Sequence, residues 1–120
     1  MTGARRLLGA RLRLPCTLSG SLTTSSGSSP VTSATRTVTV PAGNTGDLRF
    51  NNIVNDGSAF EYSKNAGAFT TISEDLVVNF ADTNTLAVRA TLPIALDECT
   101  FDLVDQTMAA NVGSYTLTRT

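Results

Sequence analysis

The sequence predicts an all-β fold, either a β-sandwich or a small β-barrel. From Arg36 onward, apolar residues recur at every second position in short runs, and Gly, Asn and Asp residues separate these runs. A period of two is typical of strands with one buried face, and many short runs with frequent turns are typical of sandwiches and barrels. Helical periodicity is nearly absent. We therefore expect about eight short strands between residues 37 and 120.

The runs follow one another at close intervals. Their alternating apolar residues are, in order, Val38 and Val40; Leu48 and Phe50; Phe60 and Tyr62; residues 68–72; Leu76, Val78 and Phe80; Leu86, Val88 and Ala90; Cys99, Phe101 and Leu103; Tyr115 and Leu117. Residues 64–67 and 81–84 carry turn residues. Pro93 lacks a backbone N–H, so residues 92–96 are expected to form a connection or a sheet edge. One helical turn is expected over residues 106–111.

The amino-terminal third differs in charge and composition. Residues 1–36 hold five Arg and no acid, whereas residues 37–120 hold four basic and ten acidic side chains; the whole chain has a net charge of −1. Residues 17–37 are mostly Ser, Thr and Gly, a composition that buries too little apolar surface to offset its ordering entropy. The sequence therefore predicts an extended basic arm over residues 1–36 and a folded domain over residues 37–120.

Composition argues against several classes of protein. The chain has no His, so it lacks the usual general base and the commonest metal ligand. Cys16 and Cys99 do not resemble a disulfide framework and are expected to be free thiols. No apolar stretch approaches the roughly 20 residues of a membrane helix. Arg11 and Arg13 interrupt what would be the apolar core of a signal peptide. We expect no enzymatic activity, cofactor, metal or membrane contact.

Three pairs of acidic residues are candidates for a metal or acid–base site. They are Glu74 with Asp75, Asp97 with Glu98, and Asp102 with Asp105. Adjacent residues on a strand point to opposite faces, and the spacing lacks the density of a calcium loop. The favoured interpretation is that these acidic residues lie on the solvated surface and form no site.

A cluster of amides around the second run is a candidate glycan-binding surface. Asn51, Asn52 and Asn55, with Tyr62, supply the amide groups and the aromatic face that sugars use. The alternative, which the pattern favours, is turn chemistry for the Asn residues and a core position for Tyr62.

The densest basic cluster is a candidate partner-binding site. Arg5, Arg6, Arg11 and Arg13 lie in the predicted arm, and the last two alternate with Leu12 and Leu14 as in a strand. Such a strand can add to the edge of a partner's sheet, with Arg supplying complementary charge. Nucleic-acid binding and an unbound tail are the alternatives; the lack of Lys and of interleaved aromatic residues does not favour nucleic acid.

Four stretches resemble the small immunoglobulin-like β-sandwich modules of tailed-bacteriophage structural proteins. They are VTVPAGNTGDLRF (38–50), FEYSKNAGAFTTI (60–72), NTLAVRATL (84–92) and TFDLVDQTMAANVGSYTLTRT (100–120). Two features depart from the family pattern. Such a module usually ends a longer protein, and residues 92–98, LPIALDE, replace a Gly-containing connection.

The resemblance implies a small antiparallel immunoglobulin-like sandwich of seven or eight strands and a location in the virion, after assembly in the host cytoplasm. It implies a non-enzymatic role, with capsid decoration as the first expectation and a tail or fibre accessory, or a carbohydrate-binding adhesion module, as alternatives. The implied partners are phage capsid or tail proteins and copies of the chain itself, with weak binding to cell-surface glycans as a further option. The family pattern has no catalytic residues to transfer.

Overall fold

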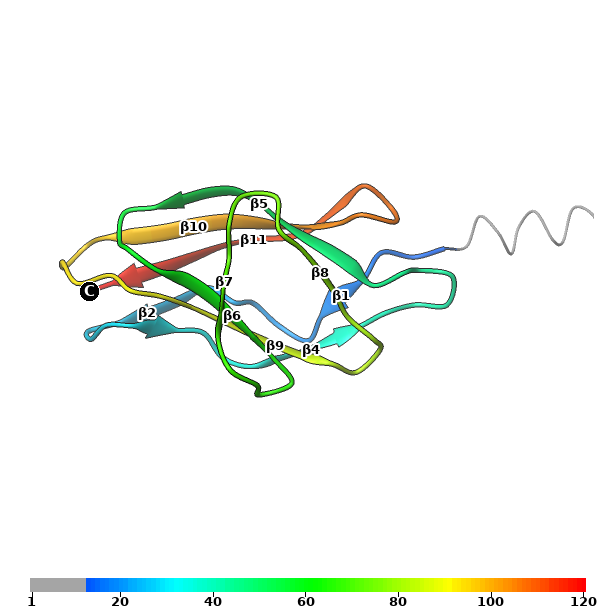
Figure 1. The fold of residues 1–120 in the computed structure, drawn as a ribbon, viewed down its shortest axis with the longest axis horizontal. Helices are drawn as coiled ribbons and strands as arrows, with labels where there is room; N and C mark the ends of the chain where they lie inside the picture. Colours follow the sequence, from blue (N-terminus) through cyan, green and yellow to red (C-terminus); the bar gives the residue numbers. More distant parts are fainter. Residues whose placement is uncertain (1–12) are drawn as a thin grey trace, which may run out of the picture.

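The computed structural model describes residues 13–120, and this part of the chain is a two-layered β-sandwich (Figure 1). Its eleven strands are β1 (Thr17–Leu18), β2 (Thr24–Ser26), β3 (Val31–Thr32), β4 (Arg36–Thr39), β5 (Asp47–Asn55), β6 (Phe60–Lys64), β7 (Thr70–Thr71), β8 (Val77–Asn79), β9 (Thr85–Ala90), β10 (Glu98–Asp105) and β11 (Ala110–Arg119). The predicted all-β sandwich is confirmed. No helix among the described residues is long and apolar enough to cross a membrane.

The strands form two sheets with the immunoglobulin order. One sheet runs β1-β4-β9-β6-β7, with β3 also on β9, and the other runs β2-β11-β10-β5-β8. Strands β1, β4, β9 and β6 take the places of immunoglobulin strands A, B, E and D, and β5, β10 and β11 those of C, F and G. Pairing is antiparallel except between β2 and β11, which run parallel. Strands β7 and β8 both lie in the connection from β6 to β9, each at the edge of a different sheet.

The core lies between the inner faces of the two sheets. Along β10, Cys99, Phe101 and Leu103 are buried while the residues between them are not, which is the predicted alternation. Phe101 contacts the rings of Phe50, Phe60 and Tyr115, with centroids 4.9–5.9 Å apart. Aromatic rings of this size bury large apolar areas, so a few of them give a domain without Trp a continuous core.

The expected boundary between Arg36 and Thr37 is wrong for the residues that the structure describes. Leu22 and Val31 are fully buried and Cys16 is 1% exposed, all within the same core as the residues of β5 and β10. Strand β2 pairs with the carboxyl-terminal strand β11, and β3 pairs with β9. Residues 13–36 are therefore part of the sandwich. Strands that are far away in the sequence bury their isolated apolar side chains and pair with their backbone.

Two smaller expectations also change. Only Thr70 and Thr71 form a strand within residues 68–72. The segment after β10 is a turn over residues 106–109, and β11 already begins at Ala110. By contrast, residues 92–96 form a connection, as the proline predicted: Pro93 is exposed between β9 and β10.

Candidate partner-binding site at the amino-terminal end of the sandwich

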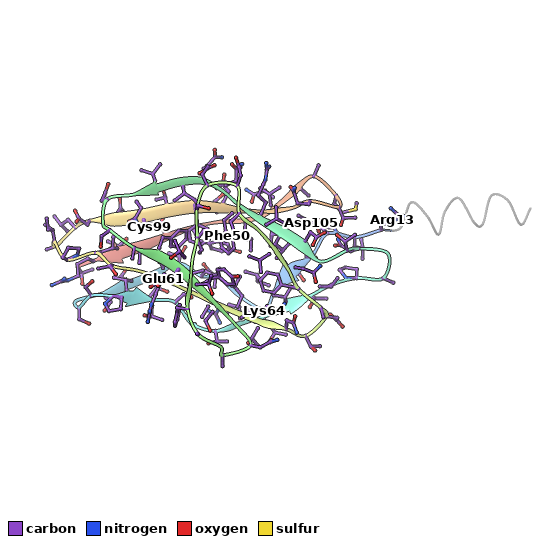
Figure 2. All side chains as sticks on the ribbon, viewed as in Figure 1. Arg13, Phe50, Glu61, Lys64, Cys99 and Asp105 are labelled. Atoms are coloured by element: carbon purple, nitrogen blue, oxygen red, sulfur yellow. The ribbon has the colours of Figure 1, made fainter. Side chains whose placement is uncertain are left out.

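The described chain enters the sandwich at one end, through Arg13 and Leu14. Both residues are exposed, and Leu14 keeps 58% of its surface accessible. The side chain of Arg13 lies against Gly43, a glycine with φ +83° in the turn between β4 and β5. Figure 2 shows Arg13 and Asp105 at this end and Cys99 toward the other. Of the four predicted partner-binding residues, Arg13 is described; Arg5, Arg6 and Arg11 lie outside the described residues.

Asp105 anchors the entering segment. Its carboxylate is fully buried, and its Oδ2 accepts hydrogen bonds from the Cys16 backbone N–H at 2.7 Å and from Asn44 Nδ2 at 2.7 Å. Its Oδ1 accepts the Met108 backbone N–H at 3.0 Å. A buried carboxylate is tolerated only when its oxygens are satisfied in this way. Asp105 thus ties residue 16 to the end of β10.

Asn44 completes this anchor. Its Nδ2 also donates to the Leu14 carbonyl at 3.1 Å, while its Oδ1 accepts the Gly46 N–H at 2.8 Å and lies 3.3 Å from the Cys16 Sγ. The amide therefore holds both the turn before β5 and the backbone of residue 14. Together, Cys16, Asn44 and Asp105 fix the position of the first described residues on the sandwich.

Ionisation at the anchor follows from burial and hydrogen bonding. Burial acts to raise the pKa of Asp105, but the hydrogen bonds from Cys16, Asn44 and Met108 outweigh it and hold that pKa below its ordinary value. Burial, and then the neighbouring Asp105 charge, raise the pKa of the Cys16 thiol to about 12. Burial raises the pKa of Cys99 to about 12 as well. The anchor therefore consists of a carboxylate and a protonated thiol at neutral pH.

Both thiols are expected to resist modification in the folded protein. Thiolate is the reactive species, and two buried thiols with a pKa of about 12 supply almost none near pH 8. Titration with an aromatic disulfide reagent should release no thiol from the native chain and two equivalents in denaturant. Rapid release of one equivalent from the native chain would contradict the burial of Cys16, since Cys16 in a flexible arm reacts freely.

The candidate glycan-binding residues are not brought together. Tyr62 lies on β6, and its half-buried ring stacks on the core residue Phe50, with centroids 6.0 Å apart, whereas the three Asn residues lie on β5. Asn52 Nδ2 donates to Asp102 at 2.8 Å, and Asn55 Oδ1 accepts the Gly57 N–H at 2.9 Å. Asn55 therefore serves a turn and Tyr62 packs on the core, as in the alternative interpretation, whereas Asn52 bonds from β5 to β10.

Two of the three acidic pairs, Glu74 with Asp75 and Asp102 with Asp105, are engaged in structural contacts. Glu74 accepts the N–H groups of Asn52 and Ile53 at 2.9 and 2.8 Å, at the bulge where two residues of β5 lie opposite Phe101. Asp102 accepts hydrogen bonds from Ser114 and then Asn52, and these lower its pKa. No group of three or more potential ligands for a metal ion, and no pocket, is formed by residues 13–120.

The anchor itself was missed by reasoning from the sequence. Its members are separated by as many as 89 positions. Two local signals pointed to it: Asn44 is a turn residue, and Asp105 is a carboxylate at an inward-facing position in the alternation of β10. Compared with known proteins, the chain matches no protein family, no curated protein and no solved structure.

Proposed function

We propose that the chain is a non-enzymatic structural protein of a tailed-bacteriophage virion, attached to neighbouring subunits through residues 1–14. Capsid decoration is the first form of this proposal, and a tail or fibre accessory is the second. The observation that carries it is the separation of charge. Residues 1–12 hold three Arg and no acid, whereas residues 13–120 hold six basic and ten acidic side chains, a net charge of −4.

The anchor supports this proposal by giving the basic segment a defined starting point. Cys16 and Leu14 are held through Asp105 and Asn44, so the segment before them starts from one fixed end of an acidic sandwich. A segment attached in this way can pair its backbone with a partner's sheet edge, while Arg5, Arg6, Arg11 and Arg13 meet acidic groups. In a particle with many copies, avidity reduces what each contact must contribute.

The carbohydrate-binding alternative has less support. Sugar-binding surfaces use an exposed aromatic face, and the ring of Tyr62 packs on Phe50 instead. The three Asn residues that were its other candidates lie on a different sheet from Tyr62.

Neutralising the segment is expected to weaken attachment without affecting the fold. The triple variant Arg5→Gln, Arg6→Gln, Arg11→Gln of the full chain should bind phage particles assembled without this protein about tenfold more weakly than the wild type in co-sedimentation. Exposed charge pairs contribute about 0.5 kcal/mol each, and the loss of three such pairs corresponds to about tenfold in affinity. A matched control, Ser25→Glu, Thr35→Glu, Ala68→Glu, makes the same change in net charge at exposed positions of the sandwich. The control should bind like the wild type. Equal binding by the arm variant and the wild type would overturn the proposal.

A further inference from the structure

The end of the sandwich opposite the anchor has an exposed apolar tip, formed by residues 93–96 between β9 and β10. Ile94 is 66% exposed and Leu96 78%, the two largest values among the exposed large apolar side chains of the described residues. Val54, which pairs with Thr100 near the start of β10, is 62% exposed at the same end. Figure 1 shows this loop beside the carboxyl terminus, at the far end from the point where the chain enters.

The tip is held rigidly, so its exposure is a built feature of the fold. Arg119 Nη1 donates to the carbonyls of Leu92 and Pro93 at 3.2 and 3.1 Å. The Leu96 N–H donates to the Arg119 carbonyl, and the Asp97 N–H donates to the Ile94 carbonyl at 3.1 Å. Leu96 has φ +73°, in the left-handed region where glycine is favoured. A leucine that is both strained and exposed contributes little to the fold itself, and such outliers concentrate at functional positions.

Acidic side chains surround the apolar tip. Asp97 follows it directly. The Asp56 N–H donates to the Glu98 carbonyl at 2.9 Å, and the Glu98 N–H donates to the Asp56 side-chain Oδ2 at 3.0 Å. The one basic residue in this group, Arg119, has its Nη1 directed to two carbonyls. The tip is therefore apolar at its centre and negative at its rim.

Residues 5–14, RRLLGARLRL, have the complementary chemistry. They combine four Leu with four Arg and contain no acid. They begin from the anchor at Asp105, whereas the tip adjoins Glu98 at the other end of β10, roughly 23 Å away at about 3.3 Å per residue. To reach the tip of its own sandwich, the segment would have to reverse and run back along the molecule. The tip of a second copy needs no reversal.

We infer that the tip binds residues 5–14 of a second copy of this chain, giving head-to-tail association. The inference rests on the proposed function, since it names a copy of the chain as the neighbouring subunit to which the segment attaches. In this association, Ile94 and Leu96 of one copy contact the leucines in residues 5–14 of the other copy. The acids Asp56, Asp97 and Glu98 face the arginines of the same segment. Because the two contacting surfaces differ, the association is heterologous and continues beyond a dimer unless rotation closes a ring.

Sedimentation velocity of the full chain between about 1 μM and 1 mM tests the inference, at low salt and at about 0.5 M salt, where charge attraction is screened. The wild type should form species that grow with concentration and shrink with salt. The tip variant Ile94→Ser, Leu96→Gly should associate at least tenfold more weakly, and its fold should be retained because glycine relieves the strained φ of residue 96. The control Val77→Ser, at an exposed apolar position on edge strand β8, should behave like the wild type.

A complementation experiment identifies the two surfaces. The tip variant keeps a normal segment, and the variant Arg5→Gln, Arg6→Gln, Arg11→Gln keeps a normal tip. Each should be monomeric alone at a concentration where the wild type associates, and a mixture should form a 1:1 complex. A monomeric wild type at about 1 mM, or a mixture that stays monomeric, would overturn the inference. If the wild type binds particles but stays monomeric at about 1 mM, this inference alone fails and the proposed function stands.

Discussion

Replacing Asp105 with alanine is expected to lower the free energy of unfolding by about 3 kcal/mol or more. The substitution leaves the Cys16 and Met108 N–H groups and the Asn44 amide without their acceptor, in a site where Asp105 is fully buried. Each unsatisfied buried donor costs about 1–3 kcal/mol. Urea denaturation of the full chain measures the change. Asp102→Ala, which removes hydrogen bonds at a partly exposed position, should cost about 1 kcal/mol or less and serves as the control. Equal losses for the two variants would contradict the anchoring role.

The anchor also predicts how stability depends on pH. Because the folded-state pKa of Asp105 lies below its ordinary value, its contribution is fully present above the unfolded-state pKa of about 3.9 and is lost as pH falls through the folded-state pKa. The wild type should therefore lose stability below about pH 4. Asp105→Asn should be less stable at neutral pH and should lose less on acidification. Parallel pH profiles for the two proteins would show that Asp105 is not a source of the dependence.

Truncating Leu22 to alanine is expected to lower the free energy of unfolding by about 2–4 kcal/mol. Leu22 is fully buried between the sheets, so the change removes apolar contacts and leaves a cavity. Leu14→Ala makes the same chemical change at an exposed position and should shift stability by about 0.5 kcal/mol or less. Thermal or urea denaturation distinguishes the two. Equal, small effects would mean that residues 13–36 are the flexible linker that their composition predicted.

The strands of the second half could be predicted because their pattern is local. Cys99, Phe101 and Leu103 alternate with more polar residues, and a strand places alternate side chains on one face whatever its partner. Pro93 likewise acts locally, since a residue without an N–H interrupts pairing wherever it stands. Such features can be read from a few consecutive residues.

The place of residues 13–36 could not be predicted in the same way. Leu22 and Val31 are single apolar residues within a Ser- and Thr-rich tract, so they create no period. Their burial depends on β2 lying parallel to β11 and β3 lying against β9, pairings that join residues more than 50 positions apart. The same holds for Glu74, whose carboxylate binds the two N–H groups that the bulge in β5 presents.

The amino-acid order alone thus determined the all-β class, the inward faces of the main strands and the concentration of positive charge in the first residues. The tertiary structure decided where the folded domain begins, how Asp105, Asn44 and Cys16 meet, and that Ile94 and Leu96 stand exposed at the opposite end. Alternation and charge are properties of neighbouring residues. Burial and hydrogen-bond satisfaction depend on which distant strands come together, and this pairing exists only in the folded chain.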